Sequence, residues 1–236
     1  YNALDQLISV TDPRNLSTTY SYNALGDLNS QVSPDTGTTT NTYDSGGNLK
    51  TSTDARSKTA TYSYDALNRV TQVAYPDQTI GFTYDTTTNG IGRLSSVADA
   101  SGSTGWTYTP NGRIASKLQV MGSQSKSVAY SYNGVGQLAT LTTPSGKTIS
   151  YGYTNGRVTS IQVNGIPLLN TILYEPFGPI SGWTWGNSTL AVRVFDTDGK
   201  VTHIDSAGLN TYGYDDAFRI TGITDTTNSA NSLTFN

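Results

Sequence analysis

The stretch ATYSYDALNRVTQV, residues 60–73, decides the fold because its pattern recurs along the whole chain. Two tyrosines placed two positions apart, Tyr62 and Tyr64, run directly into Asp65 and then into the sequence that leads to Val70. Residues two apart in a strand point to the same face of a sheet. The stretch therefore predicts a strand that ends at Tyr64, a tight turn, and a second strand that opens at Val70.

An aromatic anchor residue equivalent to Tyr64 recurs at steps of 19 to 24 residues, which gives eleven in-phase repeats. Each repeat continues with a turn residue, an aliphatic residue that opens a strand, and a second turn near its middle. Two turns and two strands in each repeat describe a β-hairpin, so the pattern predicts an all-β array of about eleven stacked hairpins over residues 1–236. The anchors are Tyr1, Tyr22, Tyr43, Tyr64, Tyr84, Tyr108, Tyr132, Tyr153, Tyr174, Phe195, Tyr214 and Phe235.

A small polar residue usually follows the anchor, and it is most often an aspartate. Such a carboxylate can accept hydrogen bonds from nearby backbone N–H groups in an Asx-type turn. A catalytic residue is needed once, whereas this one recurs, so we interpret it as part of the scaffold. These turn carboxylates are Asp44, Asp65, Asp85, Asp196 and Asp215, and Asn2, Asn23 and Asn133 take the same position in other repeats.

The spacing of apolar residues differs between the two strands of a repeat. Aromatic pairs such as Tyr62 and Tyr64 alternate regularly, which predicts an aromatic ladder across neighbouring hairpins. The aliphatics of the other strand fall three apart, as in Val70 and Val73, which strict alternation does not give. A β-bulge or a strand covered on both faces would explain this spacing, and the sequence leaves both open.

The composition excludes several classes of function. Only 13% of the residues are charged and the net charge is −3, so we expect neither a nucleic-acid interface nor an anionic-membrane surface. The absence of cysteine excludes disulfides and thiolate metal sites, and no apolar run is long enough to span a membrane. The chain begins at Tyr1 without an initiator methionine, so we read it as a fragment of a longer protein.

Few residues are candidates for chemistry. His203 is the only histidine, and the DTDG sequence at 196–199 resembles the start of a calcium loop but occupies repeat positions. We therefore expect no catalytic residue, no metal and no cofactor. Arginines such as Arg69 lie beside the turns and are expected to pair with turn carboxylates or stack on tyrosines. Trp183 and Trp185, in an irregular longer insertion around 174–195, are the candidates for carbohydrate contact.

The repeated pattern closely resembles the Rhs/YD-repeat family over the whole chain. YDALNRV at 64–70 and FDTDGKV at 195–201 are near the family consensus, and the stretch 174–196 resembles a segment found late in the repeat region of bacterial Rhs proteins. The resemblance implies a curved, spiralling β-sheet that winds into a hollow shell. Such shells enclose a C-terminal toxin in bacterial toxin complexes and Rhs effectors, and the repeats of teneurins are adhesive. The paired aspartates that release the toxin in that family have no counterpart here.

The expected function is therefore a non-enzymatic structural segment of a secreted or cell-surface bacterial protein, forming part of a shell that encapsulates or scaffolds a C-terminal toxin. The expected partners are neighbouring repeats of the parent chain and an enclosed toxin domain. The alternative is a surface adhesin or carbohydrate-binding array that contacts cell-surface glycans and self-associates through its edge strands. About 22 strands at roughly 4.8 Å each give a sheet about 105 Å wide, too narrow to enclose a folded domain alone.

Overall fold

The computed structural model describes residues 1–176, 178–206 and 208–235. The chain divides into two compact units, Tyr1–Ser127 and Val128–Asn236. The described residues form 22 β-strands and one short 3₁₀ turn, η1 at Ser229–Asn231, so the predicted all-β fold is confirmed. No helix in this part of the chain has the length and apolar character that crossing a membrane requires.

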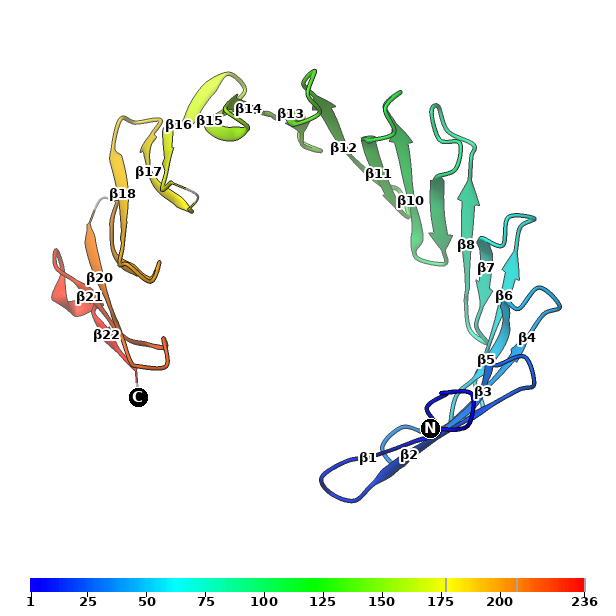
Figure 1. Ribbon diagram of the computed structural model, residues 1–236. Helices are drawn as coiled ribbons and strands as arrows, with labels where there is room; N and C mark the ends of the chain where they lie inside the picture. The colour runs from blue at the N-terminus through cyan, green and yellow to red at the C-terminus, as the bar shows by residue number, and fades with distance from the viewer. Residues whose placement is uncertain (177, 207, 236) are drawn as a thin grey trace. The chain divides into compact units, whose positions relative to one another are not determined.

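The first unit is an antiparallel sheet in which each strand pairs with the next one along the chain. Figure 1 shows these hairpins following one another in chain order. The strands are β1 Ser9–Thr11, β2 Ser17–Tyr22, β3 Leu28–Ser33, β4 Gly37–Tyr43, β5 Leu49–Thr53, β6 Thr59–Tyr64, β7 Val70–Ala74, β8 Thr79–Tyr84, β9 Leu94–Asp99, β10 Gly102–Tyr108 and β11 Ile114–Met121.

The second unit has the same sequential antiparallel pairing. Strand β12, Gln124–Tyr132, crosses the boundary between the units, and its residues from Ala129 on pair with β13. The remaining strands are β13 Leu138–Thr142, β14 Thr148–Thr154, β15 Arg157–Val163, β16 Ile166–Tyr174, β17 Ile180–Trp185, β18 Leu190–Phe195, β19 Val201–Ser206, β20 Leu209–Tyr214, β21 Ile220–Asp225 and β22 Leu233–Thr234.

A β-bulge beside the anchor explains why the aliphatic residues fall three apart. Tyr64 stands opposite Val70 and Ser63 opposite Gln72, so Thr71 is the extra residue of β7. After this extra residue, Val73 stands opposite Tyr62, so both valines face the side of the sheet that carries the anchors. Of the two explanations that the sequence leaves open, the bulge is therefore correct. The same register shift occurs at Tyr22, Tyr43, Tyr84, Tyr108, Tyr132, Tyr153, Tyr174, Phe195 and Tyr214.

The register also corrects the expected aromatic ladder. An aliphatic residue from the next strand stands opposite most anchors, as Leu49 does opposite Tyr43 and Leu138 opposite Tyr132. Aromatic rings of successive hairpins are therefore separated by a strand that presents aliphatic side chains. Among the described residues, the ring–ring contact is that of Trp183 with Trp185, which belong to one strand. The stripe of side chains thus alternates aromatic with aliphatic, because each hairpin contributes one strand of each kind.

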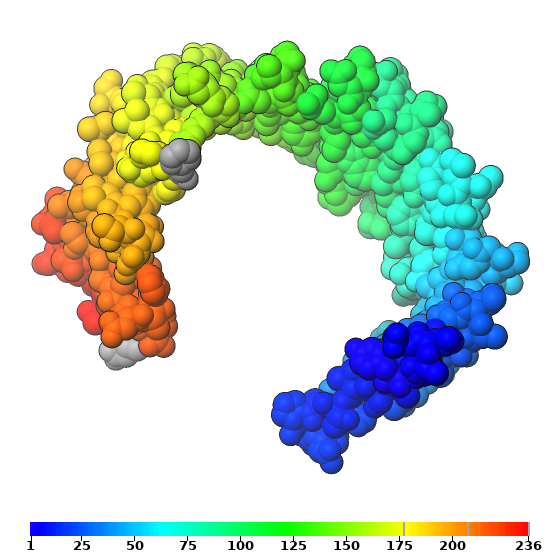
Figure 2. Space-filling view, viewed as in Figure 1, coloured from blue at the N-terminus to red at the C-terminus, as the bar shows by residue number. Residues whose placement is uncertain are grey.

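The sheet has little interior. In each unit the strands form a single layer, and Figure 2 shows the same succession of hairpins with their atoms drawn. The buried hydrophobic residues of the described chain are Ala60, Val73, Ile172 and Ala191, and Ser95 is a buried polar one. Strand β4 alternates between exposed threonines and half-buried residues that end in Tyr43. Stability therefore rests on contacts within the layer rather than on a central core.

The stretch 174–195 contains a regular hairpin where the structure describes it. Strands β17 and β18 form an ordinary antiparallel hairpin in which Trp183 stands opposite Ala191. The anchor spacing from Tyr174 to Phe195 is that of the commonest repeat. Glycine and tryptophan obscure the strand pattern here, because glycine breaks the alternation that identifies a strand from sequence.

One glycine is required by both its conformation and its surroundings. Gly102 joins β9 to β10 with φ of 148°, and a Cβ at this position would overlap the carbonyl oxygen of Val120. We expect Gly102→Ala to lower the free energy of unfolding by about 1–3 kcal/mol, because backbone must move to admit the methyl group. Chemical denaturation checks this, with Gly122→Ala as a control that has positive φ but no neighbour within contact of the new methyl. Equal losses in the two variants would show that close approach contributes nothing.

Candidate functional site

The turn after each anchor is closed by the side chain of its first residue. In the repeat of Tyr64, Asp65 Oδ1 accepts hydrogen bonds from the backbone N–H groups of Leu67, at 2.9 Å, and Arg69, at 3.0 Å. The Asp65 N–H donates to the Arg69 carbonyl at 3.0 Å, and the Asn68 N–H donates to the Asp65 carbonyl at 3.0 Å. One carboxylate oxygen therefore fixes the whole five-residue loop and aims the next strand.

The same arrangement, in which one side-chain oxygen accepts from two backbone N–H groups, recurs with either aspartate or asparagine. Asp44, Asp196 and Asp215 each accept from the N–H groups two and four residues ahead, and Asn2, Asn23 and Asn133 do so through the amide oxygen. The second turns of two repeats use Asp12 and Asp54 in this way. A neutral amide thus serves as well as a carboxylate for closing the loop. The arrangement is one of turn formation rather than of acid or base chemistry.

Hydrogen bonding keeps these carboxyl groups ionised. The backbone N–H of Arg69 is the largest cause that lowers the pKa of Asp65, and the Arg69 side chain lowers it further. The pKa of Asp85 is lowered first by the guanidinium of Arg69. A general acid near neutral pH needs a raised carboxyl pKa, so these shifts run against such a role.

The anchor tyrosine links its repeat to the previous one through its hydroxyl group. Tyr64 Oη donates to the carbonyl of Leu49 at 2.8 Å, and Leu49 is the residue that opens strand β5 beside its bulge. Burial raises the pKa of Tyr64, and the charge of Asp44 adds to the effect, so the hydroxyl remains a donor. The same bond joins Tyr22 to Leu7, Tyr43 to Leu28, Tyr84 to Val70, Tyr108 to Leu94, Tyr153 to Leu138, Tyr174 to Val158 and Tyr214 to Val201.

A second link starts in most repeats from the residue just before the strand-opening aliphatic, which we call the bridging position. Its side chain reaches the next repeat, as Asn48 does by donating to Asn68 Oδ1 at 3.0 Å and Gln137 by donating to the Gly156 carbonyl at 3.1 Å. In four repeats the bridging residue is a cation that lies over the next anchor ring: Arg69 over Tyr84, Arg93 over Tyr108, Arg157 over Tyr174 and Lys200 over Tyr214.

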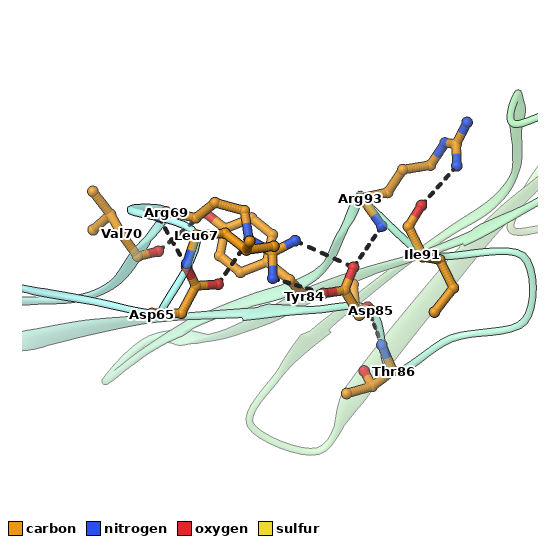
Figure 3. A network of polar contacts seen from close by, with 11 residues as sticks. Asp65, Leu67, Arg69, Val70, Tyr84, Asp85, Thr86, Ile91 and Arg93 are labelled. Atoms are coloured by element: carbon orange, nitrogen blue, oxygen red, sulfur yellow. Dashed lines mark hydrogen bonds and ion pairs between the residues drawn. The ribbon is translucent and has the colours of Figure 1, made fainter.

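Arg69 makes the most complete of these bridges, which Figure 3 shows. Its guanidinium lies between two carboxylates, with Nε 2.7 Å from Asp65 Oδ2 and Nη2 2.6 Å from Asp85 Oδ2. The same group lies 4.4 Å from the centroid of the Tyr84 ring. The prediction that arginines beside the turns pair with turn carboxylates or stack on tyrosines is therefore confirmed for Arg69, which does both.

Asp85 closes a longer turn than the other turn carboxylates. Its Oδ1 accepts from the Gly92 N–H at 2.6 Å, and its own N–H donates to the Arg93 carbonyl at 3.1 Å. The longer loop also touches its neighbours, because the Thr86 N–H donates to the hydroxyl of Ser95, the buried bulge residue of β9. The extra residues of this repeat are therefore accommodated in the loop, and the strand register is unchanged.

We expect Asp65→Ala to lower the denaturation midpoint, because the N–H groups of Leu67 and Arg69 lose their acceptor. Asp65→Asn keeps an acceptor oxygen in the geometry that Asn23 and Asn133 already show, so its denaturation midpoint should fall less than that of Asp65→Ala. What Asp65→Asn does lose is the ion pair with Arg69. Urea titrations of the two variants check the order, and a midpoint for Asp65→Asn as low as that for Asp65→Ala would assign the effect to the ion pair.

The two tryptophans proposed for carbohydrate contact are half-buried and partly enclosed by protein. Their rings meet edge to face with centroids 5.7 Å apart, and the Arg193 guanidinium lies 4.9 Å from the Trp183 ring. Trp185 Nε1 donates to the hydroxyl of Ser206 at 3.0 Å. Trp183 Nε1 and Arg193 Nε are buried without a hydrogen-bond partner in the described part of the chain. Contact with a sugar at these residues stays a prediction.

The remaining candidates for chemistry lie apart. His203 is on strand β19, where it stands opposite Val194 and Thr211. Lys200 directly follows the DTDG sequence and pairs with Asp196 at 3.4 Å and with Asp198 at 3.6 Å, so both carboxylates have a cationic partner within the chain. Within residues 1–176, 178–206 and 208–235, no three histidine or carboxylate side chains converge as a metal site.

Sequence reasoning missed the tyrosine hydroxyl link, and for the bridging link it did not show that the side chain reaches the next repeat. The tyrosine hydroxyl bond has a signal in the sequence, because the anchor is nearly always tyrosine where phenylalanine would serve as a ring. The bridging position has a weaker one, because glutamine, asparagine, arginine and lysine share a long polar side chain but no common charge. Only the register shows that the tyrosine hydroxyl contacts the previous repeat and that the bridging side chain contacts the next one.

Three segments of the chain, residues 1–38, 43–80 and 132–165, match the family model described as RHS Repeat. A comparison with curated protein sequences gives no match. Among solved structures, the crystal structure of TcdB2-TccC3-Cdc42 superimposes with a TM-score of 0.77 at 16% sequence identity over 95% of this chain. The structure of the Photorhabdus luminescens Tc holotoxin pore gives 0.77 at 16% identity over 96%, and that of TcdB2-TccC3 gives 0.72 at 14% over 92%.

At this level of identity the structural likeness shows the fold alone. The chain spans 14%, 13% and 15% of the three solved chains, so it corresponds to a small part of each. The strands and turns of the fold follow the repeat period read from the sequence. Three segments of the chain therefore match RHS repeats, and the predicted resemblance to the Rhs/YD-repeat family is confirmed.

Proposed function

We propose that the chain is a structural segment of a secreted bacterial protein and forms part of the wall of a shell around a C-terminal toxin. The observation that supports this most is the sequential pairing of bulged hairpins in each unit, joined by tyrosine and bridging links at almost every step. Such a sheet extends by adding repeats and has almost no interior of its own. The two faces of such a sheet can therefore serve as a binding surface or as a barrier.

The solved structures support the toxin as cargo by analogy. The similar chains come from complexes named TcdB2-TccC3 and from a Tc holotoxin pore, and this chain covers only a small part of each. A wall made of RHS repeats must resist unfolding without a core, and the repeated hydrogen-bonded links supply that resistance. No cofactor, metal or catalytic group is needed for this role.

The test is protease protection of the region C-terminal to the repeats in the parent polypeptide. We expect that region to resist digestion in the intact protein and to become susceptible when Tyr64→Ala and Tyr153→Ala remove two links, one in each unit. Leu67→Ser, a change at a turn tip with a 70% exposed side chain, is the matched control and should leave protection intact. Equal digestion of the C-terminal region in the original protein and in the variant with Tyr64→Ala and Tyr153→Ala would contradict the proposal.

The alternative function, an adhesin or carbohydrate-binding array, makes a different prediction. It requires saturable binding to cell-surface glycans that is lost in Trp183→Ala or Trp185→Ala. The enclosure of Trp183 between Trp185 and Arg193 argues against a free stacking surface on that ring. Glycan binding by the intact parent, together with a digestible C-terminal region, would favour this alternative over the shell.

A further inference from the structure

Five asparagines of the chain are followed by glycine, and all five pairs lie between strands. In such a pair the backbone nitrogen of the glycine can attack the side-chain carbonyl carbon of the asparagine, because glycine has no Cβ to obstruct it. A new N–Cγ bond forms, the Cγ–Nδ2 bond breaks, and the side-chain nitrogen leaves as ammonia with the displaced proton. Water then opens the cyclic imide to aspartate or isoaspartate. The pairs begin at Asn89, Asn111, Asn133, Asn155 and Asn164.

Two conditions decide how fast this happens in a folded chain. The asparagine side chain must be free to turn toward the backbone, and the glycine N–H must not be held by another acceptor. Where a condition is met only after a hydrogen bond has broken, each such bond slows the reaction by about two- to tenfold. The five pairs share the same chemistry, so their hydrogen bonds should rank them.

Two pairs have a glycine nitrogen that is already engaged. The Gly90 N–H donates to the Thr87 carbonyl at 2.9 Å, and Asn89 Nδ2 donates to the Tyr108 carbonyl at 3.1 Å. The Gly112 N–H donates to the Thr109 carbonyl at 2.8 Å. Attack at these two sites requires the turn to open first.

Two other pairs have an asparagine that is already engaged. Asn133 is a turn residue whose Oδ1 accepts from the N–H groups of Val135 and Gln137 and whose Nδ2 donates to Gln137 Oε1 at 2.9 Å. Asn164 Oδ1 accepts from the Thr148 N–H at 2.8 Å. The side chain of each must leave these partners before it can turn toward the backbone.

The fifth pair meets both conditions. Asn155 and Gly156 are exposed, and within the described residues neither the Asn155 side chain nor the Gly156 N–H has a hydrogen-bond partner. The pair forms the two-residue turn between β14 and β15, where Thr154 stands opposite Arg157 and both φ angles are positive, at 50° and 82°. We propose that Asn155 is a site of spontaneous self-modification, at which the folded chain loses ammonia and acquires aspartate or isoaspartate.

The modification would act on a link between repeats. Isoaspartate lengthens the backbone of a turn that has only two residues, and either product places a carboxylate next to Arg157. The Arg157 guanidinium lies 4.9 Å from the Tyr174 ring and donates to the Glu175 carbonyl at 3.2 Å. A new carboxylate beside Arg157 competes for its guanidinium. The contact of Arg157 with Tyr174 and Glu175 of the next repeat therefore weakens as the protein ages.

The test is incubation of the folded chain at neutral and mildly alkaline pH, followed by peptide mass spectrometry that reads all five asparagines in one sample. We expect Asn155 to convert at least about tenfold faster than Asn133, whose side chain must give up three hydrogen bonds. Conversion of Asn133 or Asn89 as fast as Asn155 would overturn the proposal.

The same chain unfolded in urea is the control, because it removes the hydrogen bonds and keeps the sequence. There the five sites should convert at rates within a few-fold of one another. A ranking that persists in urea would show that neighbouring residues, and not the fold, set the rates. Absence of conversion at Asn155 in the folded chain, with ready conversion in urea, would show that the turn protects this site and would also overturn the proposal.

Discussion

Tyr64→Ala should lower the free energy of unfolding by about 3 kcal/mol, the largest loss that we expect from one side chain of this sheet. The ring contributes to the apolar stripe opposite Val70 and next to the buried Val73. Its hydroxyl is the partner of the Leu49 carbonyl beside the bulge of the previous repeat. Truncation removes both contributions together, and in a single layer no second sheet can move in to fill the gap.

Two variants separate these contributions. Tyr64→Phe keeps the ring and leaves the Leu49 carbonyl without its donor, so we expect a loss of about 1–2 kcal/mol. Leu67→Ser changes a 70% exposed residue whose place is taken by Gly46 in another repeat, so it should lie within about 0.5 kcal/mol of the original chain. Urea denaturation followed by circular dichroism measures all three. A loss below about 1 kcal/mol for Tyr64→Ala would mean that the anchors do not hold the sheet.

The repeat, the strands and the turns could be predicted from the sequence because each depends on local pattern. Anchors at a fixed period, turn residues after them and aromatic residues at alternate positions are all visible along one segment. The choice between a bulge and a doubly covered strand could not be made from Val70 and Val73, because it depends on the residues opposite them. Tyr62 and Tyr64 supply that information only once the register is known.

The turn carboxylates and the arginines beside them were also accessible to sequence reasoning, since both are local to the turn. The direction of the bridges was not. Arg69 pairs with Asp65 of its own turn and with Asp85 of the next repeat, and nothing in the sequence distinguishes these partners. The tryptophans show a different limit, because Trp183 and Trp185 lie in strand β17, where the neighbouring glycines obscure the strand pattern in the sequence. Their enclosure depends on Arg193 and Ser206, which come from later strands.

The chain should lose stability steeply in acid. A carboxyl group whose pKa is lower in the folded chain than in the unfolded one stabilises the fold above its ordinary pKa of 3.8, and this contribution disappears as the pH falls through the folded value. The melting temperature should therefore be nearly constant from about pH 7 to pH 5 and fall increasingly below about pH 4. The carboxyl groups with lowered pKa are Asp12, Asp44, Asp54, Asp65, Asp85, Asp99, Asp196, Asp215 and Asp225.

The cause of the lowered pKa values predicts how salt acts on this acid transition. For Asp65 and Asp215 the largest cause is a backbone N–H donated to the carboxylate, and for Asp85 it is the hydrogen bond from Arg69. At 1 M salt the Debye length is about 3 Å, so interactions between exposed charges farther apart than this are screened. Short hydrogen bonds stay in place. Thermal melts between pH 3 and pH 7 at low and high salt should therefore show the same acid transition with a modest shift. A transition abolished by high salt would assign it to general charge repulsion, whereas a transition that persists and becomes shallower in Asp65→Asn assigns it to the turns.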